Sequence, residues 1–184
     1  QIGVVPVPIH ATARQDEIAH IVKDAGLRGC FVSDEDMLGK LSAAGTGLEF
    51  IFSFENKARK TALVAPEQRS GIPWGELACE PDEHLLGRIH YFREGIRPED
   101  LATILYTSGT TGMPKGVMHT FDSAAFAITE GVAFFNLSEH ERFFSYLPLA
   151  HVGERLVVEL GSLYSGGTVY YAESIDSFSK NIQK

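Results

Sequence analysis

Short apolar runs alternate with helical patterns along the first third of the chain. Runs at 4–11, 29–33 and 48–54 are rich in Val, Ile and Phe, which predicts three strands. The prolines of the first run favour an edge strand or a strand end. Between them apolar residues recur at helical spacing, over 12–26 and over 33–44, which predicts two helices. Strands that alternate with helices predict an α/β fold with a largely parallel sheet flanked by helices.

The first predicted helix carries signals at both ends. Thr12 and Gln15 have the spacing of a capping box, in which two side chains satisfy backbone N–H groups of the first turn. Gly26 follows the last apolar position, where a glycine commonly ends a helix. We therefore expect this helix to begin just after Thr12 and to end before Gly26.

The alternation resumes after one interruption. Residues 55–81 are rich in polar residues, Gly and Pro, and predict a surface loop anchored by Trp74. A near-continuous apolar run at 101–107 then predicts a strand covered on both faces. The other predicted strands lie over 116–119, 142–148 and 168–172. The other predicted helices lie over 80–95, from Thr120 or Asp122 to 135, and over 153–167. The last of these helices has an apolar stripe formed by Leu156, Val157, Leu160 and Leu163.

Composition and charge narrow the class of partner. The chain has 184 residues, of which 44% are hydrophobic and 22% charged, as in an ordinary globular protein. Its formal net charge is -8 and its Lys and Arg residues are dispersed, which argues against a nucleic-acid partner. An anionic ligand would therefore have to be bound by a local group of residues and not by a broad basic surface.

Cysteine usage and hydropathy bear on the compartment. Cys30 and Cys79 have neither metal-ligand spacing nor a disulfide framework, which favours a reducing, cytoplasmic setting. No apolar run reaches the roughly 18 to 20 residues that span a bilayer. We expect no transmembrane segment, and peripheral association with a membrane stays open.

One polar stretch, "YTSGTTGMPKG" at 106–116, carries the clearest chemistry. Its glycines permit backbone torsions closed to other residues and let a ligand approach the main chain. Its hydroxyls and backbone N–H groups are hydrogen-bond donors, and Lys115 adds a positive charge. Donors that converge in a concave turn bind anions, so the stretch predicts a polyphosphate site. The alternative is a plain surface hairpin, although a turn needs only one or two such residues.

The stretch is not a Walker A loop. That pattern places Gly immediately before the Lys and Ser or Thr after it, whereas Pro114 and Gly116 flank Lys115. The stretch also leads into a predicted strand, so no helix N-terminus would serve the phosphates.

The segment "LYTSGTTGMPKGV" at 105–117 closely resembles the phosphate-binding signature of the adenylate-forming enzymes, which include acyl-CoA synthetases, luciferases and peptide-synthetase adenylation domains. "RPEDLATILYTSGTTG" and "YLPLAHVGERLVVELGSLYSGGTVYYAESID" are most similar to the long-chain fatty acid–CoA ligases among them. The resemblance covers nearly the whole chain. It implies the Rossmann-like subdomain of the N-terminal domain of such a ligase.

The resemblance implies a reaction and a set of site residues. In these enzymes a carboxylate attacks the α-phosphorus of ATP to give acyl-AMP, and the thiol of coenzyme A then displaces AMP. Lys115 would act on the phosphates electrostatically, and the Thr107 hydroxyl would help to hold Mg²⁺. The residues that would cradle the nucleotide phosphates are Thr107, Ser108, Gly109, Thr110, Thr111, Gly112, Lys115 and Gly116.

His151 is the second candidate site residue. It follows a predicted strand, at the kind of position where α/β proteins place ligand-binding groups. A lone His is as readily a hydrogen-bonded structural residue. The resemblance implies a place near the acyl carboxylate and the thiol path, without the role of a general base. Some long-chain relatives carry an aromatic gate a few residues after this histidine, where this chain has Gly153, Glu154 and Arg155. Either the gate is built differently here or the preferred acyl group differs.

The other histidines receive weaker interpretations. His10, His20, His84 and His119 have no metal-ligand partner at i+3 or i+4, and we expect each to be solvated or locally bonded.

The chain reads as an excerpt of a longer ligase. It begins with Gln1, and the family's adenine, ribose and adenylation residues have no counterpart in it. We expect residues 1–184 to form a single partial domain, without catalytic activity alone and able to self-associate through exposed apolar surface. Two alternatives stay open: an aryl or amino-acid adenylating domain, and a non-catalytic nucleotide-binding module.

Overall fold

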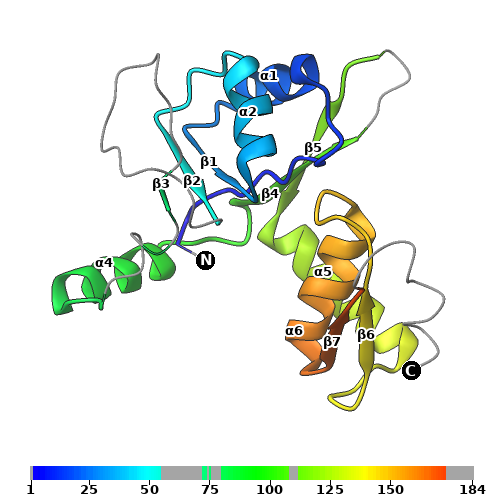
Figure 1. Ribbon diagram of the computed structural model, residues 1–184. Helices are drawn as coiled ribbons and strands as arrows, with labels where there is room; N and C mark the ends of the chain where they lie inside the picture. The colour runs from blue at the N-terminus through cyan, green and yellow to red at the C-terminus, as the bar shows by residue number, and fades with distance from the viewer. Residues whose placement is uncertain (1, 55–71, 74, 76–79, 108–111, 173–184) are drawn as a thin grey trace. The chain divides into compact units, whose positions relative to one another are not determined.

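The computed structural model of the chain describes residues 2–54, 72–73, 75, 80–107 and 112–172. Two compact units make up the chain (Figure 1). The first unit contains residues 1–10, 95–106 and 117–184, and the second contains residues 11–94 and 107–116. Most of the second unit is therefore inserted, in sequence, between two parts of the first.

The second unit is built on a parallel sheet. Strand β1 (Gly29–Val32) pairs in parallel with β2 (Phe50–Ser53), which pairs in parallel with β3 (Ile72–Pro73). Gly29 lies opposite Phe50, where its missing side chain leaves room for the aromatic ring. The predicted parallel α/β arrangement is confirmed in this unit.

Helices α1 (Gln15–Asp24) and α2 (Glu35–Ala43) contact each other and supply the core of this unit (Figure 1). Each begins at a cap: the Asp34 carboxylate accepts a hydrogen bond of 2.9 Å from the Met37 N–H at the start of α2. A hydrogen bond from the Ser33 hydroxyl, together with the bond from Met37, holds the pKa of Asp34 below its usual value. The buried apolar residues are Ile18, Ile21 and Val22 of α1, Leu41 of α2, and Val32, Leu48 and Ile51 in and beside the strands.

Helix α4 (Glu83–Glu94) also belongs to the second unit and buries none of its residues. Leu85 and Ile89 of its predicted stripe are half-buried, and Phe92 is exposed. Most of the predicted 55–81 loop, including its anchor Trp74, lies outside the described residues.

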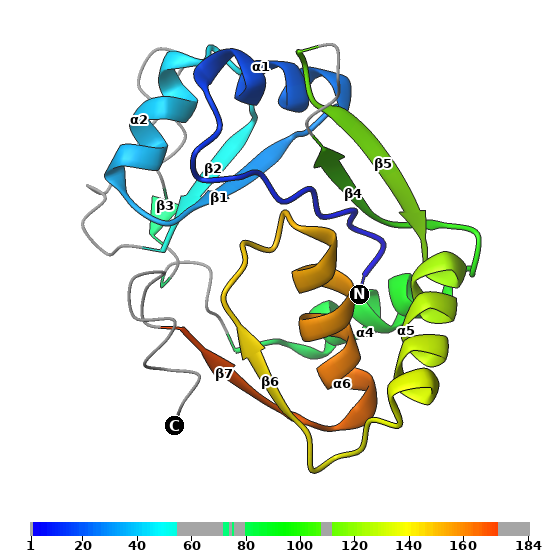
Figure 2. The ribbon, with the colours of Figure 1, turned by 90° about the vertical axis from the view of Figure 1, so that its right-hand side faces the viewer.

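The first unit contains most of the strand that leads to the polar stretch and most of the strand that follows it. Strands β4 (Leu101–Thr107) and β5 (Lys115–Thr120) are neighbours in one sheet and run in opposite directions (Figure 2). β4 has the predicted bounds and is covered on both faces, since Ala102 and Thr103 are buried and so are Leu105 and Tyr106. The apolar run was a sufficient signal because both faces of the strand pack against protein.

Helix α5 (Phe121–Phe135) follows β5 directly. The Thr120 hydroxyl accepts a hydrogen bond of 3.1 Å from the Ser123 N–H, which confirms Thr120 as the cap. At the other end Asn136 has φ 51°, the left-handed conformation in which helices commonly end.

The last elements form a second parallel pair with a helix between its strands. Strand β6 (Arg142–Ser145) pairs in parallel with β7 (Thr168–Tyr171). Between them lie the π-helix η1 (Gly153–Leu160) and the short α6 (Gly161–Ser165), which both contact α5 (Figure 2).

Two predictions near the N-terminus are wrong. Residues 4–11 form no strand, because Pro6 and Pro8 lack the N–H groups that a ladder requires. This segment instead runs beside β4, where the Pro6 carbonyl accepts hydrogen bonds from the Thr103 hydroxyl at 2.8 Å and the Ile104 N–H at 3.4 Å. The cap of α1 is Arg14 in place of Thr12, and the Glu17 carboxylate accepts from the Arg14 N–H at 2.8 Å.

The predicted inward stripe of the 153–167 helix is also wrong in part. Glu154 and Arg155 are buried, whereas Val157 and Leu163 are exposed. The π-helical winding over 153–160 changes which residues share a face, and polar partners satisfy the two buried charged side chains in part. None of the described helices has the length and apolar content needed to cross a membrane.

Candidate functional site: the loop between β4 and β5

The candidate phosphate site lies where β4 passes into β5. β4 ends at Thr107, whose side chain is exposed while the preceding Leu105 and Tyr106 are buried. A buried strand therefore supports the first hydroxyl of the site. The predicted site residues Ser108, Gly109, Thr110 and Thr111 lie outside the described residues.

The returning half of the loop, residues 112–116, combines a glycine in an unusual conformation with a stiff residue. Gly112 has φ 97°, a torsion that disfavours residues with a side chain, and the space where a Cβ would lie is open. Pro114 follows two residues later with its φ restricted by the ring. The main chain is thus accessible at Gly112 and constrained just before Lys115.

Lys115 is the first residue of β5 and is exposed. The loop therefore leads into a strand, as predicted, and the described residues offer no helix N-terminus that follows it directly. Among the described residues no carboxylate pairs with the Lys115 ammonium, so its charge is available to a ligand. Gly116, the next residue of the strand, is exposed as well.

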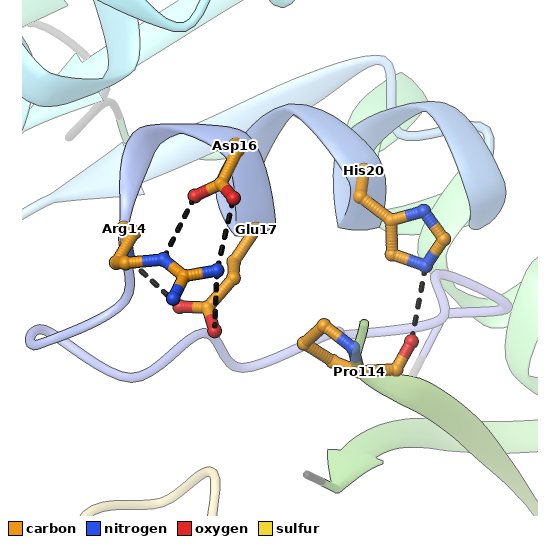
Figure 3. A network of polar contacts seen from close by, with 5 residues as sticks. All are labelled: Arg14, Asp16, Glu17, His20 and Pro114. Carbon is orange, nitrogen blue, oxygen red and sulfur yellow. Dashed lines mark hydrogen bonds and ion pairs between the residues drawn. The ribbon is translucent and has the colours of Figure 1, made fainter. Parts of the chain in front are cut away.

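Helix α1 contacts the returning half of the loop through a side chain that the sequence did not single out. The His20 Nε2 lies 3.0 Å from the carbonyl oxygen of Pro114, and the two groups point toward each other (Figure 3). The prediction that His20 is solvated or locally bonded is wrong, because its partner lies 94 residues away. Periodicity carries no signal for such a contact.

The first turn of α1 carries three charged side chains that interact with one another (Figure 3). The Arg14 guanidinium donates to the Asp16 carboxylate at 2.9 and 3.0 Å and lies 3.8 Å from Glu17. The Asp16 carboxylate raises the pKa of Arg14, and Arg14 lowers the pKa of Asp16. These exposed charges satisfy one another, and we assign them no part in the site.

His151, in the first unit, lies in the turn between β6 and η1. It is exposed, and its Nδ1 accepts a hydrogen bond of 3.1 Å from the Gly153 N–H. Its own backbone N–H donates to the Pro148 carbonyl at 2.8 Å. Because Nδ1 accepts, the neutral ring carries its proton on Nε2, which can then donate to a ligand.

Two buried side chains, Glu154 and Arg155, follow His151 in the sequence. The Glu154 side chain accepts a hydrogen bond of 3.2 Å from the Leu147 N–H, and its residue is only 2% exposed. Arg155 forms an ion pair with Glu159, and its Nε has no partner among the described residues. The sequence did not indicate that Glu154 would support the turn.

Among the described residues of the loop, one side chain could serve as a ligand of Mg²⁺. No group of three His, Cys, Asp or Glu side chains lies close enough to bind a metal ion within the described parts of the chain. The exposed Thr107 hydroxyl is a neutral oxygen donor, and Mg²⁺ is commonly held by few protein ligands together with phosphate oxygens and water. Thr107 thus fits the role of a single ligand.

Comparison with known proteins finds similar sequences among coenzyme A ligases. Human long-chain-fatty-acid–CoA ligase 1 is 36% identical over 168 residues, which are 84% of this chain and 23% of that protein. The 2-succinylbenzoate–CoA ligase of Bacillus licheniformis is 40% identical over 84 residues, 46% of this chain and 17% of that protein. The chain thus spans about a quarter or less of these relatives.

A solved structure shows the same fold. It is assigned as a long-chain-fatty-acid CoA ligase from Rhodopseudomonas palustris CGA009, and its TM-score is 0.71 at 18% identity. The match covers 97% of this chain and 41% of that one, and it confirms the expected α/β class. The family model described as AMP-binding enzyme matches residues 1–184. The chain therefore belongs to the AMP-binding enzyme family.

Proposed function

We propose that this chain carries the ATP phosphate-binding loop of a longer, AMP-forming long-chain fatty acid–CoA ligase. Membership of the AMP-binding family and the 36% identity to a human long-chain ligase support this assignment. The observation that carries it is local. An exposed Lys115 without a carboxylate partner among the described residues begins β5, three residues after an open glycine.

The residues of the loop then have distinct roles. Backbone N–H groups and hydroxyls between Thr107 and Gly116 bind the β- and γ-phosphates, and Lys115 supplies a fixed positive charge to them. Mg²⁺, held in part by Thr107, would add positive charge at the phosphate oxygens. The protein's contribution here is orientation and electrostatic stabilisation of a leaving pyrophosphate, without proton transfer by Lys115.

His151 contributes on the acyl side of the reaction in this proposal. Its Nε2–H is exposed and is oriented by the Gly153 N–H on the opposite nitrogen. Such a donor can hydrogen-bond the carboxylate of the acid or the thioester oxygen formed with coenzyme A. It orients substrate and does not act as the general base.

Lys115→Ala tests the phosphate role directly. Loss of a charge-assisted contact weakens binding by about 10- to 100-fold, so we expect pyrophosphate binding by the chain to fall by that factor. Isothermal titration calorimetry with pyrophosphate and with ATP measures it. Lys23→Ala, an exposed lysine on α1 of the same unit, is the matched control and should bind as the parent does.

The same titrations separate the proposal from a non-catalytic nucleotide module. A phosphate loop without the adenine-binding part binds ATP and pyrophosphate with similar, weak affinity. Strong preference for ATP would contradict the proposal, and so would unchanged binding by the Lys115→Ala variant.

A second candidate is a ligase for aromatic acids, which the 40% identity to a 2-succinylbenzoate–CoA ligase over 84 residues favours. The two candidates share the loop chemistry and differ in the acid. Coenzyme A thioester formation by the longer protein with palmitate, benzoate and amino acids would decide between them.

A further inference from the structure

The contact between His20 and Pro114 joins a packed helix to the candidate phosphate loop (Figure 3). His20 is half-buried in the second half of α1, next to Ile21 and Val22, which are 3% and 4% exposed. The helix is therefore fixed in the core of the second unit at this point. The His20 side chain therefore holds the Pro114 end of the loop against a fixed helix.

The chemistry of the partner fixes the direction of this hydrogen bond. A carbonyl oxygen only accepts, so His20 Nε2 must carry the proton. The bond thus exists with the Nε2–H tautomer or with the imidazolium, and not with the Nδ1–H tautomer.

The bond is important because the carbonyl that accepts it lies directly before Lys115 in the chain. Pro114 has no N–H, so its carbonyl is its only backbone hydrogen-bonding group. That carbonyl belongs to the peptide plane shared with Lys115, and the plane is rigid. Holding the oxygen therefore restricts the starting direction of Lys115, while Gly112 with φ 97° would otherwise leave this part of the loop free to turn.

We propose that His20 is a positioning residue for the phosphate loop, one that orients Lys115 toward a polyphosphate through the Pro114 carbonyl. This inference rests on the proposed function, because it concerns how the loop binds its ligand. His20 touches no substrate and takes no part in the chemistry.

His20→Phe removes the donor and keeps a ring of similar size. We expect about fivefold weaker pyrophosphate binding by the chain, which corresponds to about 1 kcal/mol, the value of one neutral hydrogen bond. His20→Gln, whose amide N–H can reach the same oxygen, should stay within about twofold of the parent. His84→Phe on α4, an exposed histidine of the same unit, is the matched control.

A double-mutant cycle with Lys115→Ala separates positioning from general destabilisation. If His20 acts through Lys115, the His20→Phe change weakens pyrophosphate binding in the parent and has no effect once Lys115 is alanine. An equal loss in both backgrounds would mean a merely structural role and would overturn the inference. His20→Asn, with a shorter amide, replaces His20→Phe in the cycle if circular dichroism shows that the Phe variant is unfolded.

The outcomes also distinguish this inference from the proposed function. If Lys115→Ala weakens binding while His20→Phe binds as the parent does, the loop binds phosphate and the positioning role is wrong. If the parent chain and Lys115→Ala bind pyrophosphate equally, or neither binds, the proposed function fails and this inference fails with it.

Discussion

At the residue scale, two hydrogen bonds from the start of η1 shape the turn that carries His151. The Gly153 N–H donates to His151 Nδ1 at 3.1 Å, and the buried Glu154 accepts from the Leu147 N–H at 3.2 Å. The bond from Gly153 orients the imidazole ring, and the bond between Leu147 and Glu154 joins the two ends of the turn. A side chain on a short turn is oriented reliably only when its own neighbours hold it.

This arrangement predicts the tautomer of His151. With the ring neutral, Nε2 should carry the proton and Nδ1 should be bare, because the Gly153 N–H occupies Nδ1. In Glu154→Ala the Leu147 N–H loses its acceptor, and we expect a mixture of the two tautomers as the turn loosens. Nitrogen-15 chemical shifts of the His151 ring report this directly. Protonation of Nδ1 in the parent chain would contradict the geometry.

Some residues of the candidate site can be predicted from the sequence, and others cannot. Thr107, Gly112 and Lys115 can be proposed from the sequence because they lie in one contiguous motif. The contact of His20 with Pro114 could not, since the residues are 94 positions apart and no pattern relates them. The burial of Glu154 was equally hidden, because an acidic residue is ordinarily expected at the surface.

At the element scale, the accuracy of the predictions follows the number of faces that each element buries. β4 was predicted with its observed bounds because it packs on both faces. α1 was predicted as a helix because its buried positions recur at helical spacing, although it begins later than predicted, after Arg14 and not after Thr12. Residues 4–11 were assigned to a strand on composition, although prolines there prevent a ladder. The inward face of 153–160 was missed because a π-helix does not follow the 3.6-residue period.

The approach of β7 to β6 depends on a glycine. A Cβ on Gly167 would lie 2.6 Å from a ring carbon of the buried Phe143 and 3.0 Å from the Glu141 carbonyl oxygen. We expect Gly167→Ala to lower the free energy of unfolding by about 1–3 kcal/mol through overpacking. Urea denaturation followed by circular dichroism measures this change.

Gly131→Ala is the matched control in the same unit. Gly131 lies within α5, and nothing would lie within 4 Å of its Cβ. An alanine there should raise the free energy of unfolding by about 0.5–1 kcal/mol through helix propensity. Similar effects of the two substitutions would mean that β6 and β7 do not approach closely at Gly167.

At the scale of the whole molecule, the chain aligns with 23% of the human ligase and 41% of the bacterial structure. It contains the proposed phosphate loop and a candidate residue for the acyl side. Large apolar side chains are exposed on the described surface, among them Phe134, Leu163 and Tyr171. Such surface is typical of regions that pack against other protein, and we propose that the chain self-associates through it.

The 184-residue chain should therefore bind polyphosphate without completing the reaction. We expect no acyl-AMP or coenzyme A thioester from palmitate, ATP and Mg²⁺ above a blank without protein, because positioning of all reactants supplies most of the catalysis. Mass spectrometry of the products measures this, and the longer protein under the same conditions is the positive control. Turnover by the purified chain would show that it carries a complete active site.

The bond between Pro6 and Thr103 bears on the order in which the chain assembles during synthesis. The β1–α2–β2 segment can pair as soon as it leaves the ribosome, because its partners are neighbours in sequence. Residues 1–10 must instead wait until 101–106 have been made, since their hydrogen bonds are to β4. Residues 1–10 are thus among the late ones of this chain to find their native contacts, although they are made before β4, and the closure of so long a loop makes this a slow step.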